Sequence, residues 1–349
     1  IYTIVEFFEK RFDRKNKILV GFLQIILLLF WIGIQAVAFA SLASVLIGFD
    51  YIFALILASV ITILYTAIGG LKVDIISDFI QFWIIFIMFI VIFVIGLGNV
   101  GGFENLFSSL PQGHLDVFSF GGIGFFISAT LFSGFLFIAG TQNWQRIISA
   151  KNKEVARKSF LLSIPFLIII SIFTLFMGLF SSVLLEGINK NTAIFSLMQN
   201  ILPTALYGIG LASILAVIMS SIDSLLIGGS TIISREIFKK RYVGDKEKLL
   251  FARLLTGIFG VVGFLVALIF PDIVNLSILQ GTMALIFPAA IIAGLYSKRV
   301  SSNASFYSIL IPFVLLVILF PILEKQTLMV TTPFSILIVI FYDKIFKRK

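Results

Sequence analysis

The sequence predicts an all-α protein that crosses a membrane many times. Hydrophobic residues make up 60% of its 349 residues, and charged residues make up only 12%. A soluble globular chain of this length could not remove so much apolar surface from water. The apolar residues also fall into ten runs, most of which approach or exceed the ~20 residues that a membrane-spanning helix needs.

We therefore expect ten transmembrane helices, preceded by a basic, amphipathic helix that lies along the inner membrane surface. The preceding segment covers residues 1–17. The runs at 51–68 and 328–341 are short. The run at 18–47 is long enough to be tilted or broken. The ten runs are 18–47, 51–68, 76–97, 119–140, 160–184, 204–233, 250–270, 273–295, 305–323 and 328–341.

The distribution of charge supports this topology. If the N-terminus is cytoplasmic and the helices alternate in direction, only Lys190 and Lys325 of the 26 Lys and Arg residues face outward. Cytoplasmic loops carry such an excess of basic residues. We therefore assign the net charge of +9 to these loops rather than to nucleic-acid binding, and we expect a plasma-membrane protein with both termini of this chain in the cytoplasm.

Histidine and cysteine chemistry is excluded by composition. The chain has no cysteine, and its one histidine, His114, lies in a hydrophilic loop. Disulfides, thiolate metal sites and histidine-based triads are therefore not expected.

The run 204–233 carries a carboxylate, Asp223, near its middle. A charge at this depth costs a few kcal/mol or more and normally faces a protein interior or a watery cavity. One interpretation is a buried Asp that bonds to neighbouring hydroxyls and holds two helices in register. The other, which we favour, is an oxygen-lined cation site. At about 100° per residue, one side of the helix holds Val217, Ser220, Ser221, Asp223, Ser224 and Gly228, and the other holds Ile218, Met219, Ile222, Leu225 and Leu226.

Other polar features are less specific. Asp78 begins the run 76–97, where free helix N-terminal amides stabilise an acidic residue. Gly69-Gly70 is typical of a tight turn between helices. Thr141, Gln142 and Asn143 could line a cavity at a helix break, or the stretch could be an ordinary basic inner loop with Arg146, Lys151 and Lys153.

Three stretches of the sequence are similar to the sodium/solute symporter family, which includes the sodium/proline and sodium/galactose transporters. They are YTAIGGLKVDIISDFIQ at 65–81, WQRIISAKNKEVARKS at 144–159 and IMSSIDSLLIGGSTIISREIF at 218–238. The opening TIVEFFEKRFDRKNK resembles the basic loop after the third helix of that family. The resemblance covers essentially the whole chain, with the motifs in the family's order.

This resemblance implies a leucine-transporter-type fold, in which two five-helix inverted repeats bind substrate and sodium near the membrane midplane at broken helices. We expect one transmembrane transporter domain over residues 1–349, N-terminally truncated so that the first two core helices are missing. Its parts would be 1–17 at the inner surface, 18–97 with the last three helices of repeat one, 119–295 as repeat two, and 305–341 with two further helices.

The resemblance also implies ion ligands. Ser220 and Ser221 match the hydroxyl pair that binds the principal sodium of the family, with the carbonyl of Val217 beside them. Asp78, Asp223 and Ser224 match positions that bind a second sodium in some members, and we expect Asp78 to lie within reach of the other two. Where the family often has an Asp-Gln pair before the Gln-Arg of the inner loop, this chain has Gln142 and Asn143 at a tighter spacing. These two are our substrate candidates, and the solute cannot be read from them.

The function implied is sodium-coupled symport of a small organic solute by alternating access, within a lipid bilayer. No nucleic acid and no obligate protein partner are expected. Three alternatives stay open: a proton-coupled or sodium-independent transporter of the same fold, a membrane-embedded enzyme that uses Asp78 and Asp223, and a transporter-derived sensor. We expect no enzyme, because Asp78 lies near the inner surface and not at the middle of its helix.

Overall fold

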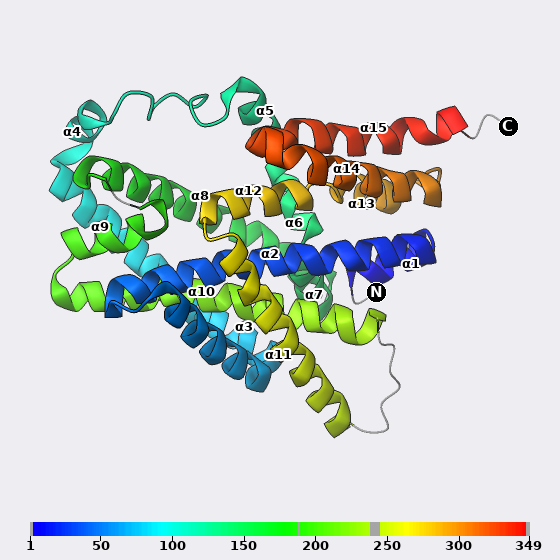
Figure 1. Cartoon of the computed structure of the whole chain (residues 1–349), viewed down its shortest axis with the longest axis horizontal. Helices are drawn as coiled ribbons and strands as arrows, with labels where there is room; N and C mark the ends of the chain where they lie inside the picture. Colours follow the sequence, from blue (N-terminus) through cyan, green and yellow to red (C-terminus); the bar gives the residue numbers. More distant parts are fainter. Residues whose placement is uncertain (1–2, 188, 238–244, 347–349) are drawn as a thin grey trace. The chain divides into compact units, whose positions relative to one another are not determined.

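The computed structural model is built almost entirely of helices (Figure 1). It describes residues 3–187, 189–237 and 245–346, and within these ranges it leaves out the side chains of residues 47, 65, 67–74, 237, 245, 246, 248 and 249. The α-helices are α1 (Ile4–Arg11), α2 (Arg14–Ile47), α3 (Tyr51–Val100), α4 (Gly102–Ser109), α5 (Gly122–Phe132), α6 (Leu136–Ala139), α7 (Thr141–Ser149), α8 (Lys153–Leu184), α9 (Ala193–Ile201), α10 (Thr204–Ile232), α11 (Asp245–Ile269), α12 (Ile273–Ala284), α13 (Pro288–Tyr296), α14 (Ser302–Leu323) and α15 (Leu328–Phe346). Three short 3-10 segments and one π-helical segment connect them, namely η1 (Ser133–Phe135), η2 (Lys190–Thr192), η4 (Glu324–Thr327) and the π-helical η3 (Ile233–Ile237).

Eight stretches of the described residues are helical, long and apolar enough to cross a bilayer. One of them, Ser302–Phe346, contains both α14 and α15, and Tyr51–Leu64 is a shorter apolar helix beside the eight. The chain is therefore a multi-pass membrane protein, and the count of ten remains a prediction.

α3 differs most from its expected form. Two helices were expected at 51–68 and 76–97, but the helix continues through Gly69-Gly70 from Tyr51 to Val100. A straight helix of this length would reach about 75 Å at ~1.5 Å per residue, which is far longer than a bilayer core. Figure 1 shows α3 bent between its two apolar parts, so the change of direction occurs without loss of helical backbone.

Two expected helices are interrupted instead. The run 119–140 forms α5, η1 and α6 in succession, and α7 begins directly after Gly140. The run 273–295 is divided into α12 and α13 by a turn at residues 285–287, after which Pro288 opens α13. Proline suits the first turn of a helix because its missing N–H would have no partner there.

Side-chain caps and glycines set the helix boundaries. Asp50 accepts a hydrogen bond from the backbone N–H of Ile52 at the start of α3, and Asn152 accepts one from Val155 at the start of α8. Such caps satisfy N–H groups that have no partner inside the helix. Gly101 ends α3 at φ 84°, in the left-handed region that glycine enters without steric cost.

Asp13 acts in the same way in front of α2. Its Oδ1 accepts hydrogen bonds from the backbone N–H and the side-chain amide of Asn16, at 2.9 and 3.0 Å. Partial burial favours the neutral acid, but the hydrogen bonds from Asn16 outweigh it and lower the pKa of Asp13.

By its internal contacts the chain divides into two compact units. The first comprises residues 1–34, 117–149 and 225–349. Within it α14 lies along α15 (Figure 1), and α13 and α5 also pack on α15. The apolar face of α1 is buried here, with Ile4 and Phe8 fully covered and the ring of Phe7 lying 5.5 Å from that of Trp144. These side chains therefore contact protein rather than lipid.

The second unit comprises residues 35–116 and 150–224. Its main packing is between α3 and α8, with α4 and α9 against both. Phe93 of α3 lies 5.1 and 5.2 Å, between ring centroids, from Phe173 and Phe176 of α8. Gly96 lets Phe180 approach, because a Cβ there would lie 2.5 Å from its ring. The many phenylalanines of this region thus form a core between two helices.

Candidate functional site

The predicted sodium ligands of α10 come together on a single turn. The hydroxyls of Ser220 and Ser221 both donate to the carbonyl oxygen of Val217, at 3.0 and 3.1 Å. One turn on, Ser224 donates to the carbonyl oxygen of Ser220 at 3.2 Å. Because the hydroxyl protons of Ser220 and Ser221 are engaged by the backbone, lone pairs of these two oxygens can face a cation, and oxygen lone pairs are what a hard cation requires.

The turn is only partly shielded. Ser220 and Ser221 are half-buried, whereas Ile218 and Ile222 on the opposite side are 2% and 0% exposed. Ile218 and Ile222 are therefore packed against protein, whereas the serine pair is more accessible. A cation reaching this turn would approach the hydroxyls.

Asp223 is buried beside a hydroxyl that sequence reasoning missed. Its side chain is 3% exposed, and its Oδ1 accepts a hydrogen bond from Thr66 of α3. Thr66 lies one turn after Thr62, and its hydroxyl is 2.8 Å from the Thr62 carbonyl oxygen. The i, i+4 spacing of two threonines in an apolar run was the available signal, because intramembrane polar residues usually face the protein interior.

The place of Asp78 relative to this turn stays a prediction. Asp78 is half-buried on α3. Away from this turn, Met88 of α3 lies near Gly210 of α10, where a Cβ would be 3.4 Å from the side chain of Met88. Thr66, which donates to Asp223, lies on the same helix twelve residues before Asp78.

The second candidate region is the helix break at Gly140, in the other unit. The expectation of a break before Gln142 and Asn143 is met. α6 ends at Ala139, Gly140 is extended at φ −80° and ψ 116°, and α7 begins at Thr141. The side chains of Gln142 and Asn143 lie over Gly140, where a Cβ would come within 2.8 and 3.0 Å of their amide nitrogens. Only glycine leaves room for this arrangement.

The carbonyls freed by the break are bonded by side chains. Asn143 Nδ2 donates to the carbonyl of Phe137 at 2.8 Å, and Trp144 Nε1 donates to that of Ile138 at 2.8 Å. Gln142 is 7% exposed, and its Oε1 has no hydrogen-bond partner in the described part of the chain. Gln142 thus brings a buried acceptor to an unwound segment, whereas Asn143 uses its amide group to hold the backbone.

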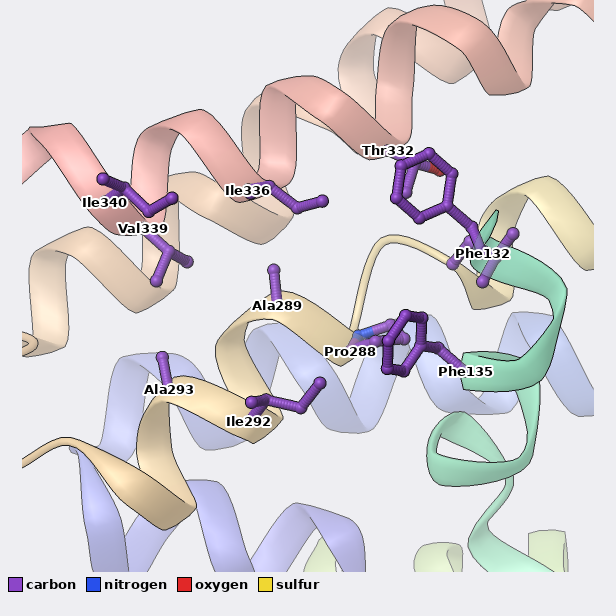
Figure 2. A pocket seen from close by; sticks show the side chains of 11 residues that line it. Phe132, Phe135, Pro288, Ala289, Ile292, Ala293, Thr332, Ile336, Val339 and Ile340 are labelled. Atoms are coloured by element: carbon purple, nitrogen blue, oxygen red, sulfur yellow. The ribbon is translucent and has the colours of Figure 1, made fainter. Parts of the chain in front are cut away.

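A separate pocket of about 270 Å³ lies in the first unit (Figure 2). Figure 2 shows Phe132 and Phe135 at one end of it and Ile340 of α15 at the other. Thr332 is the one residue of its lining with a polar side chain, and neither Gln142 nor Asn143 lines it. The apolar lining suits a hydrocarbon group, and none of the predicted site residues lines this pocket.

Comparison with known proteins places these residues in context. The model of the family described as "Sodium:solute symporter family" matches residues 1–312 of this chain. A sodium/proline symporter of Staphylococcus aureus (strain bovine RF122 / ET3-1) is 26% identical over 280 residues, which are 76% of this chain and 55% of that protein. The osmoregulated proline transporter OpuE of Bacillus subtilis (strain 168) is 25% identical over 316 residues, 86% of this chain and 64% of that protein. The chain thus spans somewhat over half the length of these curated relatives.

A solved structure shows the fold. It is the substrate-bound outward-open state of a Na⁺-coupled sialic acid symporter, which superposes with a TM-score of 0.81 over 99% of this chain and 77% of its own, at 19% identity. The chain therefore has the leucine-transporter-type fold that the resemblance implied.

Proposed function

This chain belongs to the sodium:solute symporter family, and from that premise we propose that it takes part in sodium-coupled symport of a small organic solute by alternating access. The observation that carries the proposal is the turn of α10 in which Ser220 and Ser221 share the carbonyl of Val217. A carbonyl and two hydroxyls with engaged protons are neutral oxygen ligands, which suit a monovalent cation that must bind and then leave.

A second sodium is proposed at Asp223 and Ser224, with Asp78 as a further ligand and Thr66 as the hydrogen-bond donor that orients Asp223. Both Asp223 and Ser224 are at least nine-tenths buried. A buried carboxylate needs a compensating cation or proton, so the same geometry supports proton coupling as the competing function. The two differ in the ion on which uptake depends.

The solute is proposed to bind at the break around Gly140, through Gln142 and Asn143. Discontinuous helices provide such sites in this fold. Residues 119–295 would then form one five-helix repeat whose first helix is the broken one. Two relatives are named as proline transporters, so proline is the first solute to test. We also propose the plasma membrane as location, with both termini of this chain cytoplasmic.

Uptake of labelled proline and other small solutes into vesicles that contain the complete gene product tests the function. We expect uptake to require a sodium gradient. Ser221→Ala should raise the half-saturating sodium concentration roughly tenfold. The variant loses the contact between the Ser221 hydroxyl oxygen and the sodium ion, and such a contact is about as strong as a hydrogen bond to a charged group.

Ser230→Ala is the matched control. Ser230 lies on the same helix and donates to the carbonyl of Ile227 at 3.1 Å, so the same chemical change is made outside the proposed ligand set. Uptake driven by a proton gradient without sodium would reject sodium coupling in favour of the proton. Equal effects of Ser221→Ala and Ser230→Ala would reject the proposed ligand.

A further inference from the structure

One carbonyl at the break has a donor from far along the chain. The carbonyls of Phe137 and Ile138 are bonded by side chains only six residues ahead. The carbonyl of Ala139, the last residue of α6, instead accepts a hydrogen bond from Nε2 of Gln24 on α2 at 2.9 Å. The two residues are 115 positions apart.

The same amide also reaches the other side of the break. Gln24 Oε1 accepts a hydrogen bond from the hydroxyl of Thr141, the first residue of α7, at 3.0 Å. Gln24, Ala139 and Thr141 are all 0% exposed. One side chain therefore donates to the end of α6 and accepts from the start of α7, and the carboxamide of Gln24 supplies both groups.

These bonds fix the direction in which the chain leaves the break. Gly140 alone leaves the backbone free to adopt many conformations. With Ala139 and Thr141 both tied to one rigid amide group, the residues that follow, Gln142 and Asn143, have a defined position. Because these groups are fully buried, loss of either bond removes the partner of a buried donor or acceptor.

We propose that Gln24 is a positioning residue that sets the geometry of the Gly140 break and thereby the affinity of the solute site. This inference rests on the proposed function, in that it takes Gln142 and Asn143 as the solute-binding segment. The buried, unpartnered Oε1 of Gln142 supports it, because a segment with an acceptor left over is suited to a ligand that carries an N–H donor. Sequence reasoning assigned no role to Gln24.

The test uses variants that keep shape and remove the hydrogen bonds. Gln24→Met retains the length of the side chain, and Thr141→Val retains the branching. Thr141→Val removes one buried hydrogen bond and should raise the KM for solute roughly tenfold. Gln24→Met removes both hydrogen bonds and should raise the KM more. The half-saturating sodium concentration should stay the same in both variants. The double variant should be little worse than Gln24→Met alone, because Gln24→Met already removes the hydrogen bond from Thr141.

Conservative and remote variants serve as controls. Thr141→Ser keeps the hydroxyl and should restore a near-normal KM. Gln199→Met makes the same change as Gln24→Met at an exposed position of α9, and Thr174→Val matches Thr141→Val on the exposed side of α8. Neither should change KM.

Hydrogen–deuterium exchange of the purified protein gives a readout that does not depend on transport. In Gln24→Met, peptides covering residues 136–149 should exchange faster, with other peptides and the thermal midpoint near those of the unchanged protein. Faster exchange throughout with a lowered midpoint and an unchanged KM would reduce Gln24 to a general structural contact and overturn the proposal. If the unchanged protein shows no sodium-dependent uptake, the proposed function fails, while a local exchange effect still supports Gln24 as the residue that holds the break.

Discussion

At the scale of single residues, Thr66 has the clearest individual role. Its hydroxyl donates to the buried Asp223, which lies 157 residues later in the chain. A carboxylate in low dielectric depends on such donors, because burial disfavours its charged form. The hydroxyl is therefore a neighbour of the candidate site, although the family resemblance alone did not point to it.

We expect Thr66→Val to lower the free energy of unfolding by roughly 1.5–3 kcal/mol, the usual range for a hydrogen bond to a charged group. Thr66→Ser keeps the donor and should lose much less. Denaturant titration in mixed micelles measures both. If the serine variant is as unstable as the valine variant, packing of the methyl group and not the hydroxyl is what matters at this position.

The residues of the candidate site could be predicted only in part. The spacing of Val217, Ser220 and Ser221 identified a turn that the structure forms, because residues three and four apart on a helix are neighbours. Thr66 and Gln24 were missed, since their partners are 157 and 115 residues away. Helical periodicity gives the face on which a residue lies, and it contains no information about which other helix covers that face.

At the scale of elements, α1 is held to the ends of other helices by ionic and polar contacts in its unit. Thr3 caps α1 and donates to Oε1 of Glu236 at 2.9 Å, in the π-helical segment η3. Lys17, at the start of α2, forms ion pairs with Glu236 at 2.7 Å and with Glu9. Arg11 donates to the carbonyls of Gly294 at the end of α13 and of Ser297 just after it. A cation near a helix C-terminus is favoured by the helix dipole.

Lys17→Met should therefore destabilise the protein strongly. The side chains of Lys17 and Glu236 are each 8% exposed and that of Glu9 is 34% exposed. Removal of the lysine leaves a buried Glu236 without its cation, which costs about 3–5 kcal/mol for a buried pair. Most of this loss arises at Glu236, since solvent screens Glu9.

The exposed pair Lys158–Glu154 provides the control for this experiment. Its side chains are 68% and 73% exposed, so Lys158→Met should change the thermal midpoint in detergent very little. Adding Glu236→Gln to Lys17→Met should recover part of the stability. Equal shifts for Lys17→Met and Lys158→Met would contradict a buried pair.

The sequence predicted the elements better than their interruptions. Long apolar runs gave the positions of α8, α10 and α11 closely, because hydrophobic length is the requirement of a bilayer. The continuity of α3 was not foreseen, since Gly69-Gly70 is typical of a turn. The turn between α12 and α13 was also missed: Pro288 starts a helix as readily as it kinks one, and local sequence does not decide between the two.

At the scale of the whole molecule, composition established the class and the family resemblance established the fold. Periodicity could not have given the leucine-transporter-type arrangement, because every spanning helix presents a similar apolar pattern whichever neighbour it contacts. The fold is confirmed by the superposition at a TM-score of 0.81. The orientation in the membrane is a different property, and it depends on the loop charges.

The topology can be tested in a chain that contains no cysteine, so every single-cysteine variant reports on one position. Because only Lys190 and Lys325 of the 26 basic residues fall in loops expected outside, we expect cysteines at Ser108 and Lys190 to react with a membrane-impermeant maleimide in intact cells. Cysteines at Lys151 and Arg299 should react only after the membrane is opened. All four positions are exposed, so a lack of labelling would reflect the membrane and not burial. Labelling of Lys151→Cys from outside, with Ser108→Cys protected, would invert the whole arrangement and place both termini of this chain on the outer side.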